Sequence, residues 1–340
     1  MSEAARVAQA EVPLLEVQDL QVTFAGRVGL GAGLLGRRGS EARAVDGVSL
    51  AIRPGEVLAL AGESGCGKTT LARTILGLER PRRGRILFEG RPIDVSGLRA
   101  YRRRVQMVFQ DPAGALNPRQ TVYESVAEGL RVHGIHDPEE ERVAEALAAA
   151  GLRPPERFFL LYPHELSGGQ RQRVVIAGAL VLEPRLIVAD EPVSMLDASV
   201  KGEILQLLLR LRAEFGLALL VVTHDLGLAW TIADRVAVMY LGKIVEVGPA
   251  EDVLTEPLHP YTKALLEVAP ERGGEVTTRQ ILSGEPPDPT RIPSGCRFHP
   301  RCPVVLSGEA ARLGSEERNR TEEPELREIR PGHFVACHLA

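Results

Sequence analysis

Cysteine, lysine and long hydrophobic runs are all scarce in this sequence of 340 residues. Its four cysteines are too few for the disulfide framework of a small secreted domain and fit a reduced compartment. The longest apolar runs, such as Leu217 to Val222, are far too short to span a bilayer. The N-terminal stretch contains acidic residues and does not resemble a signal peptide. These absences predict a cytosolic protein rather than a secreted or membrane-spanning one.

An excess of basic charge is also missing. The 45 acidic and 41 basic residues give a formal net charge of −4, so the chain as a whole does not attract nucleic acid. The arginine clusters at residues 80–85 and 102–104 are more typical of solvated turns than of a nucleic-acid patch. We therefore expect no nucleic-acid partner. The length, with 44% hydrophobic residues, predicts about two domains, or one large α/β domain with an appendage.

The strongest motif lies near residue 65 and has the phosphate-loop spacing G-x-x-x-x-G-K-[ST]. It consists of Gly62, Glu63, Ser64, Gly65, Cys66, Gly67, Lys68, Thr69 and Thr70. An apolar run at residues 57–61 precedes it and a helical apolar pattern follows, so the motif lies between a strand and a helix. There the glycines let backbone N–H groups surround phosphate oxygens, Lys68 supplies a charge, and Thr69 offers a hydroxyl to Mg²⁺. A glycine turn with a chance lysine is the alternative, but only four lysines occur.

Apolar alternation predicts two antiparallel strands ahead of this loop, at residues 14–24 and 48–52. The glycine- and arginine-rich stretch between them, Ala25 to Arg43, predicts a long, mobile loop. Further strands are expected at residues 85–88 and 105–109, the second ending at Gln110. From residue 111 to about residue 161 the pattern changes to helices. This order indicates an α/β sheet domain with a helical insertion.

Another predicted strand ends in two carboxylates. Residues 185–189 form an apolar run followed by Asp190 and Glu191, and ligands bind at the carboxyl edge of a parallel sheet. There Asp190 would hold Mg²⁺ through water, and Glu191 would polarise the attacking water. Taken alone, the two acids could instead cap the next helix.

His224 follows a predicted strand at residues 217–223, which itself follows a helix at residues 198–215. A lone histidine after a strand is usually a packed or surface residue. Because this strand ends at the same sheet edge as the phosphate loop, His224 becomes a candidate ligand of the terminal phosphate.

The pentapeptide Leu166 to Gln170, LSGGQ, completes an ordered set with the phosphate loop, Gln110, Asp190-Glu191 and His224. Alone it could be a serine-capped helix start. As a set, these motifs resemble the nucleotide-binding subunit of ATP-binding cassette (ABC) transporters, over residues 14–249. The resemblance implies a phosphate-loop nucleoside triphosphatase core: a mixed sheet with flanking helices, antiparallel strands at the N-terminus and an inserted α-helical subdomain at about residues 111–183. It further implies an ATP-binding domain at residues 1–250 and a C-terminal extension at residues 251–340.

The resemblance also assigns roles by position. In this family two such domains close head to tail, with ATP between the phosphate loop of one and the signature of the other. Phe24 would stack on adenine, Gln110 would sense Mg²⁺ and water, Glu191 would act as base, and His224 would hold the γ-phosphate. Mg²⁺ would be bound by Thr69, Gln110 and, through water, Asp190. The partner's ATP would meet a signature made of Ser167, Gly168, Gly169 and Gln170, and Asp197 would lie in the dimer contact.

The C-terminal third looks like the extension of oligopeptide and dipeptide importers, at residues 257–266, 284–287 and 293–303. It implies an ATPase subunit that powers peptide import from the cytoplasmic face of the membrane as a peripheral protein. Its partners would be a second ABC ATPase subunit, either a paralogue or a second copy, and two membrane permease subunits. An extracytoplasmic substrate-binding protein would act through these permeases.

Other functions stay open at this stage. Relatives import nickel or sugars, and some ABC ATPases act in DNA repair or on ribosomes without a membrane partner. The long coiled-coil insertion or the second cassette of those proteins is missing here. A simple nucleotide kinase would need neither LSGGQ nor a dimer.

Two further expectations concern the extension. Its proline density predicts a loosely built tail lying against the sheet domain. Relatives in the peptide-importer group often carry four cysteines there that are thought to hold an iron–sulfur cluster, and Cys296, Cys302 and Cys337 fall in the matching segments. Water or a nearby histidine, His299, His333 or His338, would have to complete such a site. The alternative is three thiols that only pack the tail.

Overall fold

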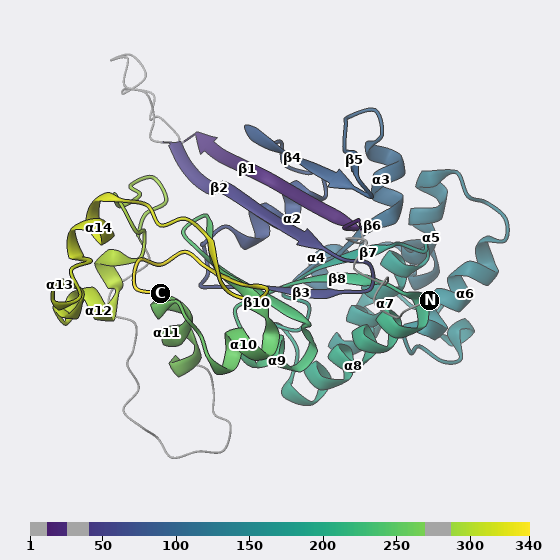
Figure 1. Cartoon of the computed structure of the whole chain (residues 1–340). Coiled ribbons are helices and arrows are strands. Elements are labelled where there is room, and N and C mark those ends of the chain that lie inside the picture. The colour runs from purple at the N-terminus through teal and green to yellow at the C-terminus, as the bar shows by residue number, and fades with distance from the viewer. Residues whose placement is uncertain (1–11, 26–40, 269–286) are drawn as a thin grey trace, which may run out of the picture.

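The computed structural model describes residues 12–25, 41–268 and 287–340, and these form two sheets with helices on both sides (Figure 1). The first sheet is antiparallel, in the order β2-β1-β4-β5. Its strands are β1 (Leu15–Ala25), β2 (Glu41–Ile52), β4 (Arg83–Phe88) and β5 (Arg91–Pro92). The predicted antiparallel strands at the N-terminus are therefore present.

The second sheet is mixed and has the order β11-β12-β10-β9-β3-β8-β7-β6. Its strands are β3 (Val57–Ala61), β6 (Val105–Val108), β7 (Leu186–Asp190), β8 (Ala218–Thr223), β9 (Arg235–Tyr240), β10 (Lys243–Pro249), β11 (Arg327–Arg330) and β12 (His333–Val335). Strands β6, β7, β8, β3 and β9 run parallel. Every residue of β3, β7 and β8 is buried, as their continuous apolar runs predict. The carboxyl ends of these strands meet at one edge, where a ligand site is expected.

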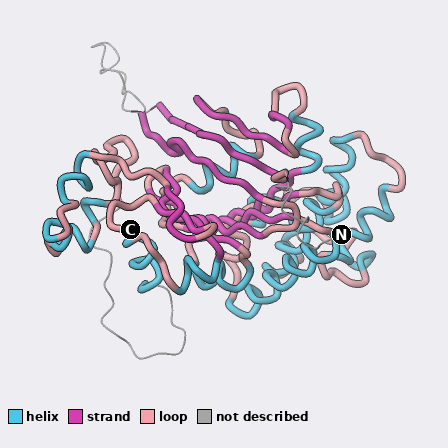
Figure 2. Tube along the Cα trace, in the orientation of Figure 1, coloured by secondary structure: helices cyan, strands magenta, loops and turns pink. Residues whose placement is uncertain are grey.

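Helix α2 (Lys68–Ile75) packs between the two sheets and contacts strands of both (Figure 2). Its buried residues Leu71 and Ile75 join the core shared with β1, β2 and β3. Helix α3 (Leu98–Arg104) follows the first sheet and leads directly into β6. Because α2 begins immediately after the phosphate loop, this packing fixes the loop at the carboxyl edge.

Between β6 and β7 the described elements are all helical, as the sequence predicts. They are α4 (Pro112–Ala115), α5 (Val122–His133), α6 (Glu139–Ala149), α7 (Gly168–Leu180) and the short 3₁₀ turns η2 (Pro155–Arg157) and η3 (Pro163–Glu165). A capping box between Thr121 and Glu124 starts α5, and Gly134 ends it in the left-handed conformation. The apolar faces of α5, α6 and α7 form one core with α8 (Ala198–Phe215) and the central strands.

The loop predicted from Ala25 to Arg43 is wrong at both ends, where the chain forms strands β1 and β2. Residues 26–40 lie outside the described residues, but β2 already begins at Glu41 and pairs with β1 from Ala25 onward. Residues 41–43 of β2 pair with residues 23–25 of β1. The paired strands therefore extend beyond the alternating apolar positions by which the sequence predicts them.

The expectation of a loosely built tail is wrong, although the tail does lie against the sheet domain. Strand β12 pairs with β10 and brings β11 with it, so the tail extends the central sheet. Phe298 and Tyr261 are fully buried against Tyr240 of β9. Prolines start the short helices instead of preventing packing, since Pro260 and Pro303 stand at first helical positions, where no N–H is needed.

The remaining helices follow β8 or belong to the tail. They are α9 (Leu226–Ile232), α10 (Ala250–Thr255), α11 (Pro260–Val268), η4 (His299–Arg301), α12 (Pro303–Leu306), α13 (Glu309–Arg312) and α14 (Glu316–Thr321). Helices α12 to α14 lie at the opposite end of the molecule from α5 and α6 (Figure 1). Among the described residues, no helix combines the length and apolar character needed to cross a membrane.

Candidate nucleotide-binding site

The phosphate loop joins β3 to α2, and its glycines are required by its shape. Gly62, Gly65 and Gly67 have φ angles of 151°, 79° and 111°, which side chains disfavour. A Cβ atom at Gly67 would lie 2.0 Å from the backbone oxygen of Ala44, and one at Gly62 would lie 2.2 Å from that of Met239. No side chain caps α2, so its first N–H groups are free to meet an anion.

Lys68 and Thr69, the first two residues of α2, point to different parts of the site. The buried Lys68 Nζ donates to the carbonyl oxygens of Gly62 (2.7 Å) and Glu63 (2.9 Å) inside the loop. Thr69 Oγ1 donates to Asp190 Oδ1 at 3.2 Å. Burial raises the pKa of Asp190, and the adjacent Glu191 raises it further, while Thr69 opposes the shift. A hydroxyl and a poorly solvated carboxylate that converge in this way fit a magnesium site.

Gln110, Glu191 and His224 come from the ends of three adjacent parallel strands and meet at one point. Glu191 Oε2 accepts a hydrogen bond from Gln110 Nε2 at 3.0 Å, and its Oε1 lies 3.0 Å from His224 Nδ1. Glu191 has a φ angle of 47°, in the left-handed region that a residue with a side chain rarely adopts. Such strain persists where the surrounding structure demands it and is concentrated at functional sites. The structure thus brings together three residues that the sequence analysis grouped.

The signature residues start helix α7. Ser167 Oγ accepts from the Gln170 N–H (3.2 Å), and Gln170 Oε1 accepts from the Ser167 N–H (2.9 Å), which makes a capping box. Gly169 packs closely, since a Cβ atom there would lie 2.7 Å from Val200 Cγ1. Ser167 is exposed at this helix end, as is Asp197 at the start of α8. The N-terminus of α7 is therefore presented to solvent, where an anion can reach it.

Phe24 lies at the end of β1, next to Ala42 of β2, with 41% of its surface exposed. The neighbouring residues 26–40 lie outside the described residues. Its contact with adenine stays a prediction.

The cysteines of the extension do not form the predicted cluster site. Cys296, Cys302 and Cys337 are buried, and no group of three or more His, Cys, Asp or Glu residues is placed to hold a metal ion in the described part of the chain. The three histidines are engaged elsewhere: His299 with the Cys296 carbonyl, His333 with Glu246, and His338 with the Glu322 carbonyl. The residues present do not fit an iron–sulfur cluster.

These thiols should instead resist modification. Burial raises the pKa of Cys296 to about 12, with the nearby Cys337 and Cys302 thiols adding to the shift, and burial also raises the pKa values of Cys302 and Cys337. The thiolate is the reactive form, so a raised pKa lowers the reactive fraction at about pH 8. We expect labelling of the reduced native protein by a thiol reagent to be at least about 100-fold slower than labelling after denaturation. Rapid labelling of three thiols in the native protein would contradict this packing.

The extension contacts the phosphate loop, which the sequence did not predict. Arg301 forms two hydrogen bonds with the Glu63 carboxylate, and Tyr261 Oη accepts from the Glu63 N–H. Both residues lie in segments that resemble importer extensions, but nothing in the sequence links them to a loop about 200 positions earlier.

Comparison with known proteins defines the class. Residues 45–194 match the family model described as ABC transporter, and the structure is similar to solved ABC cassettes. One is the dimeric post-hydrolysis cassette MJ0796 bound to ADP and Pi, with a TM-score of 0.59 and 30% identity over 69% of this chain and 98% of that chain. The predicted fold class is confirmed, and this is an ABC ATPase.

The group within that class follows from the extension and the relatives. Residues 245–308 match the model described as oligopeptide/dipeptide transporter, C-terminal region. The oligopeptide transport ATP-binding protein AppF of Bacillus subtilis (strain 168) is 44% identical over 96% of this chain and 97% of its own length. The putative oligopeptide transport ATP-binding protein YkfD of the same organism is 44% identical over 96% of both chains. The chain belongs to the family of ABC transporter ATP-binding proteins that carry this extension.

Proposed function

We propose that this chain is the ATP-hydrolysing subunit of a transporter that imports oligopeptides or dipeptides. The observation that carries the proposal is that three groups lie at one edge of the sheet. They are the phosphate loop with the uncapped start of α2, the Thr69–Asp190 pair, and the Gln110–Glu191–His224 group. The same chain carries an extension that matches the oligopeptide/dipeptide transporter model.

Each group has a chemical task in this proposal. Backbone N–H groups of the loop and Lys68 bind the β- and γ-phosphates. Thr69 and Gln110, with Asp190 through water, would hold Mg²⁺, which neutralises phosphate charge when bound. Glu191 accepts a proton from the attacking water, and Gln110 and His224 hold its carboxylate in place through the two 3.0 Å contacts. His224 also meets the γ-phosphate.

The second face of the nucleotide is contacted by another subunit. The exposed start of α7, with Ser167 to Gln170, offers helix N–H groups to the partner's phosphates, and Asp197 lies in the contact. The similarity to a dimeric cassette supports this pairing. The partner is a paralogue or a second copy of this chain. Phe24 stacks on adenine at the outer end of the site.

Transport itself takes place in other subunits. In this proposal the chain binds two membrane permease subunits at the cytoplasmic face as a peripheral protein, and an extracytoplasmic binding protein delivers the peptide to them. Two named peptide-transport relatives, each aligned over 96% of this chain, support the assignment to peptide import over other solutes.

Uptake by cells tests the cargo. Deleting the gene in its native host should abolish uptake of labelled oligopeptides, because the permeases then lack their ATPase. Wild-type protein should restore uptake, whereas Lys68→Ala should not. Nickel and sugar uptake, measured in parallel, should stay unchanged. Loss of nickel or sugar uptake with normal peptide uptake would contradict the proposed cargo.

A further inference from the structure

Residues Cys296 to Cys302 of the extension, here called the clamp segment, carry two buried arginines that reach the ATP-binding part of the chain. Arg297 and Arg301 are only 6% and 5% exposed. Buried guanidinium groups require full pairing, and both find carboxylates far away in sequence. Arg301 pairs with Glu63 and Arg297 pairs with Asp46, while Glu323 of the extension completes the second pair.

Arg301 holds one end of the phosphate loop. Its Nη1 and Nη2 donate to the two carboxylate oxygens of Glu63 at 2.7 and 3.0 Å, the bidentate geometry that gives the strongest pairs. Tyr261 Oη accepts from the Glu63 N–H at 2.8 Å. The remaining polar group of Glu63, its carbonyl, accepts from Lys68 Nζ. The extension therefore engages the side chain and the N–H of a residue within the phosphate loop itself.

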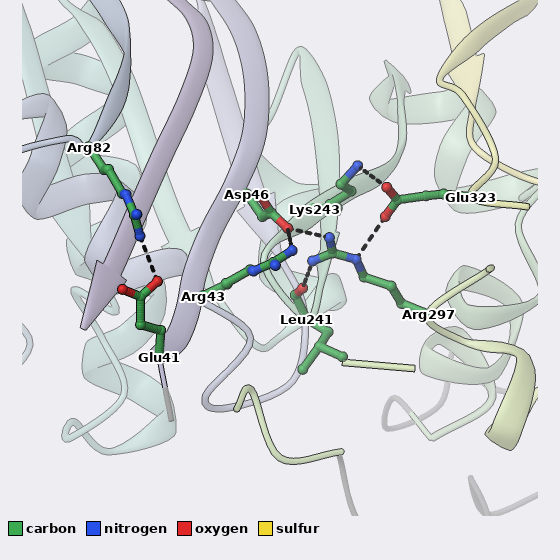
Figure 3. Close-up of polar contacts among 8 residues, drawn as sticks. All are labelled: Glu41, Arg43, Asp46, Arg82, Leu241, Lys243, Arg297 and Glu323. Carbon is green, nitrogen blue, oxygen red and sulfur yellow. Dashed lines mark hydrogen bonds and ion pairs between the residues drawn. The ribbon is translucent and has the colours of Figure 1, made fainter. Parts of the chain in front are cut away.

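Arg297 supports the other end of the loop through a turn, and Figure 3 shows its contacts with Leu241, Asp46 and Glu323. Its Nη1 donates to the Leu241 carbonyl at 2.6 Å and its Nη2 contacts Asp46 Oδ2 at 2.5 Å. Leu241 lies in the turn between β9 and β10 with a φ angle of 43°. The next residue, Gly242, donates its N–H to the Cys66 carbonyl at 2.8 Å and accepts from the Asp46 N–H at 2.9 Å. Arg297 thus holds a strained turn that binds the loop at Cys66.

Packing against two other aromatic rings holds Tyr261 in place for its hydrogen bond with the Glu63 N–H. The rings of Tyr240, Tyr261 and Phe298 pack together with centroid separations of 4.6 to 5.3 Å. Tyr261 is completely buried, and Phe298 lies within the clamp segment between the two arginines. The extension therefore presents Tyr261 and Arg301 to Glu63 from one packed unit.

We propose that the clamp segment positions the phosphate loop, so that affinity for ATP depends on docking of the extension. This inference rests on the proposed function and concerns the same nucleotide site. Because Arg301 and Tyr261 hold Glu63 before ATP arrives, the loop does not have to be ordered when ATP binds, and preorganisation of this kind raises affinity. Arg301 is a positioning residue, since it contacts the loop and not the reacting atoms.

Two variants of the purified chain test the proposal. Arg301→Met keeps a long side chain but removes both hydrogen bonds, and Tyr261→Phe removes only the hydroxyl and keeps the packed ring. We expect the dissociation constant of Mg-ATP, measured by equilibrium binding, to rise about tenfold for Arg301→Met and about threefold for Tyr261→Phe. The KM for ATP should rise in parallel, while kcat at saturating ATP stays within about twofold. Arg301→Lys, which keeps the charge, should recover part of the affinity.

A matched control removes another arginine of the extension. Arg330 of β11 forms an exposed ion pair with Glu256 instead of with the phosphate loop. Arg330→Met should leave ATP affinity and KM unchanged. Thermal unfolding of each variant shows whether it is folded, and Tyr261→Phe decides the question if Arg301→Met does not fold.

The outcomes separate positioning from simple anchoring of the tail. Unchanged ATP affinity in Tyr261→Phe and in folded Arg301→Met would overturn the proposal. A fall in kcat and in unfolding temperature at unchanged KM would also overturn it, because the contacts would then only anchor the extension. Failure of the wild-type chain to bind ATP would refute the proposed function first, and the positioning role with it.

Discussion

Replacing Glu191 by glutamine is expected to slow ATP hydrolysis by about 10²- to 10⁴-fold while leaving ATP binding intact. Glutamine can still accept hydrogen bonds at the position where Gln110 and His224 hold the carboxylate, but it cannot take a proton from water. The contacts of Lys68 and Thr69 with nucleotide are not touched by this change. ATP therefore persists at the site, and the variant should accumulate as a closed pair with its partner subunit.

Phosphate release and light scattering measure the two parts of this prediction. Scattering should increase on addition of ATP to Glu191→Gln in the presence of its partner, and phosphate release should stay near background. Glu214→Gln, an exposed change at the end of α8, is the control and should behave like the wild type. Turnover by Glu191→Gln at the wild-type rate would remove Glu191 from its catalytic role.

Lys68→Ala is expected to lose most of the affinity for ATP. The Lys68 ammonium is buried inside the loop, where its charge is poorly screened and a contact with phosphate is correspondingly strong. Removing it takes away the positive side chain that lies inside the loop next to the phosphates. Equilibrium binding of a fluorescent ATP analogue would measure the change. Lys263→Ala, an exposed lysine of α11, should bind normally. Equal affinity in the two variants would refute the phosphate-loop assignment.

The parallel strands of the central sheet were predictable because each of them is marked by its own residues in the sequence. Strands β3, β7 and β8 appear as uninterrupted apolar runs, and each is followed by a residue of the site: Gly62, Glu191 and His224. Parallel strands that end at one edge bring these residues together without any detail of side-chain packing. The order β8-β7-β6 places His224, Glu191 and Gln110 at neighbouring strand ends, and the 3.0 Å contacts of Glu191 are made there.

The tail was not predictable in the same way. Its stability depends on pairings between distant segments, such as Glu246 of β10 with Val335 of β12. High proline content indicates a loop when only neighbouring residues are considered, yet here prolines begin short helices whose apolar residues enter a core with β9 and β10. The Arg301–Glu63 pair was not predictable either, because nothing in the residues around Arg301 indicates a partner so far away in the sequence.

The structure does not support the cluster that the resemblance implies, for a related reason. Spacing in the sequence placed Cys296, Cys302 and Cys337 in segments that resemble cluster-bearing extensions, but ligation depends on where side chains meet. In the described residues these thiols form no ligand set, and hydrogen bonds occupy the neighbouring imidazoles. Burial of the thiols, which raises their pKa values, fits a packing role instead.

ATP hydrolysis by the intact transporter tests the central claim most directly. The chain would be isolated from native membranes together with its companion subunits and returned to lipid vesicles. The rate of phosphate release would be measured with and without the peptide-loaded binding protein. We expect oligopeptide to stimulate the rate in the wild-type complex. We expect no stimulation in a complex that carries Glu191→Gln in this chain and the matching change in the partner ATPase subunit. The proposal that this chain powers peptide import would be contradicted if the rate of phosphate release did not change with peptide but rose with nickel or a sugar. It would also be contradicted if the preparation contained no membrane subunits.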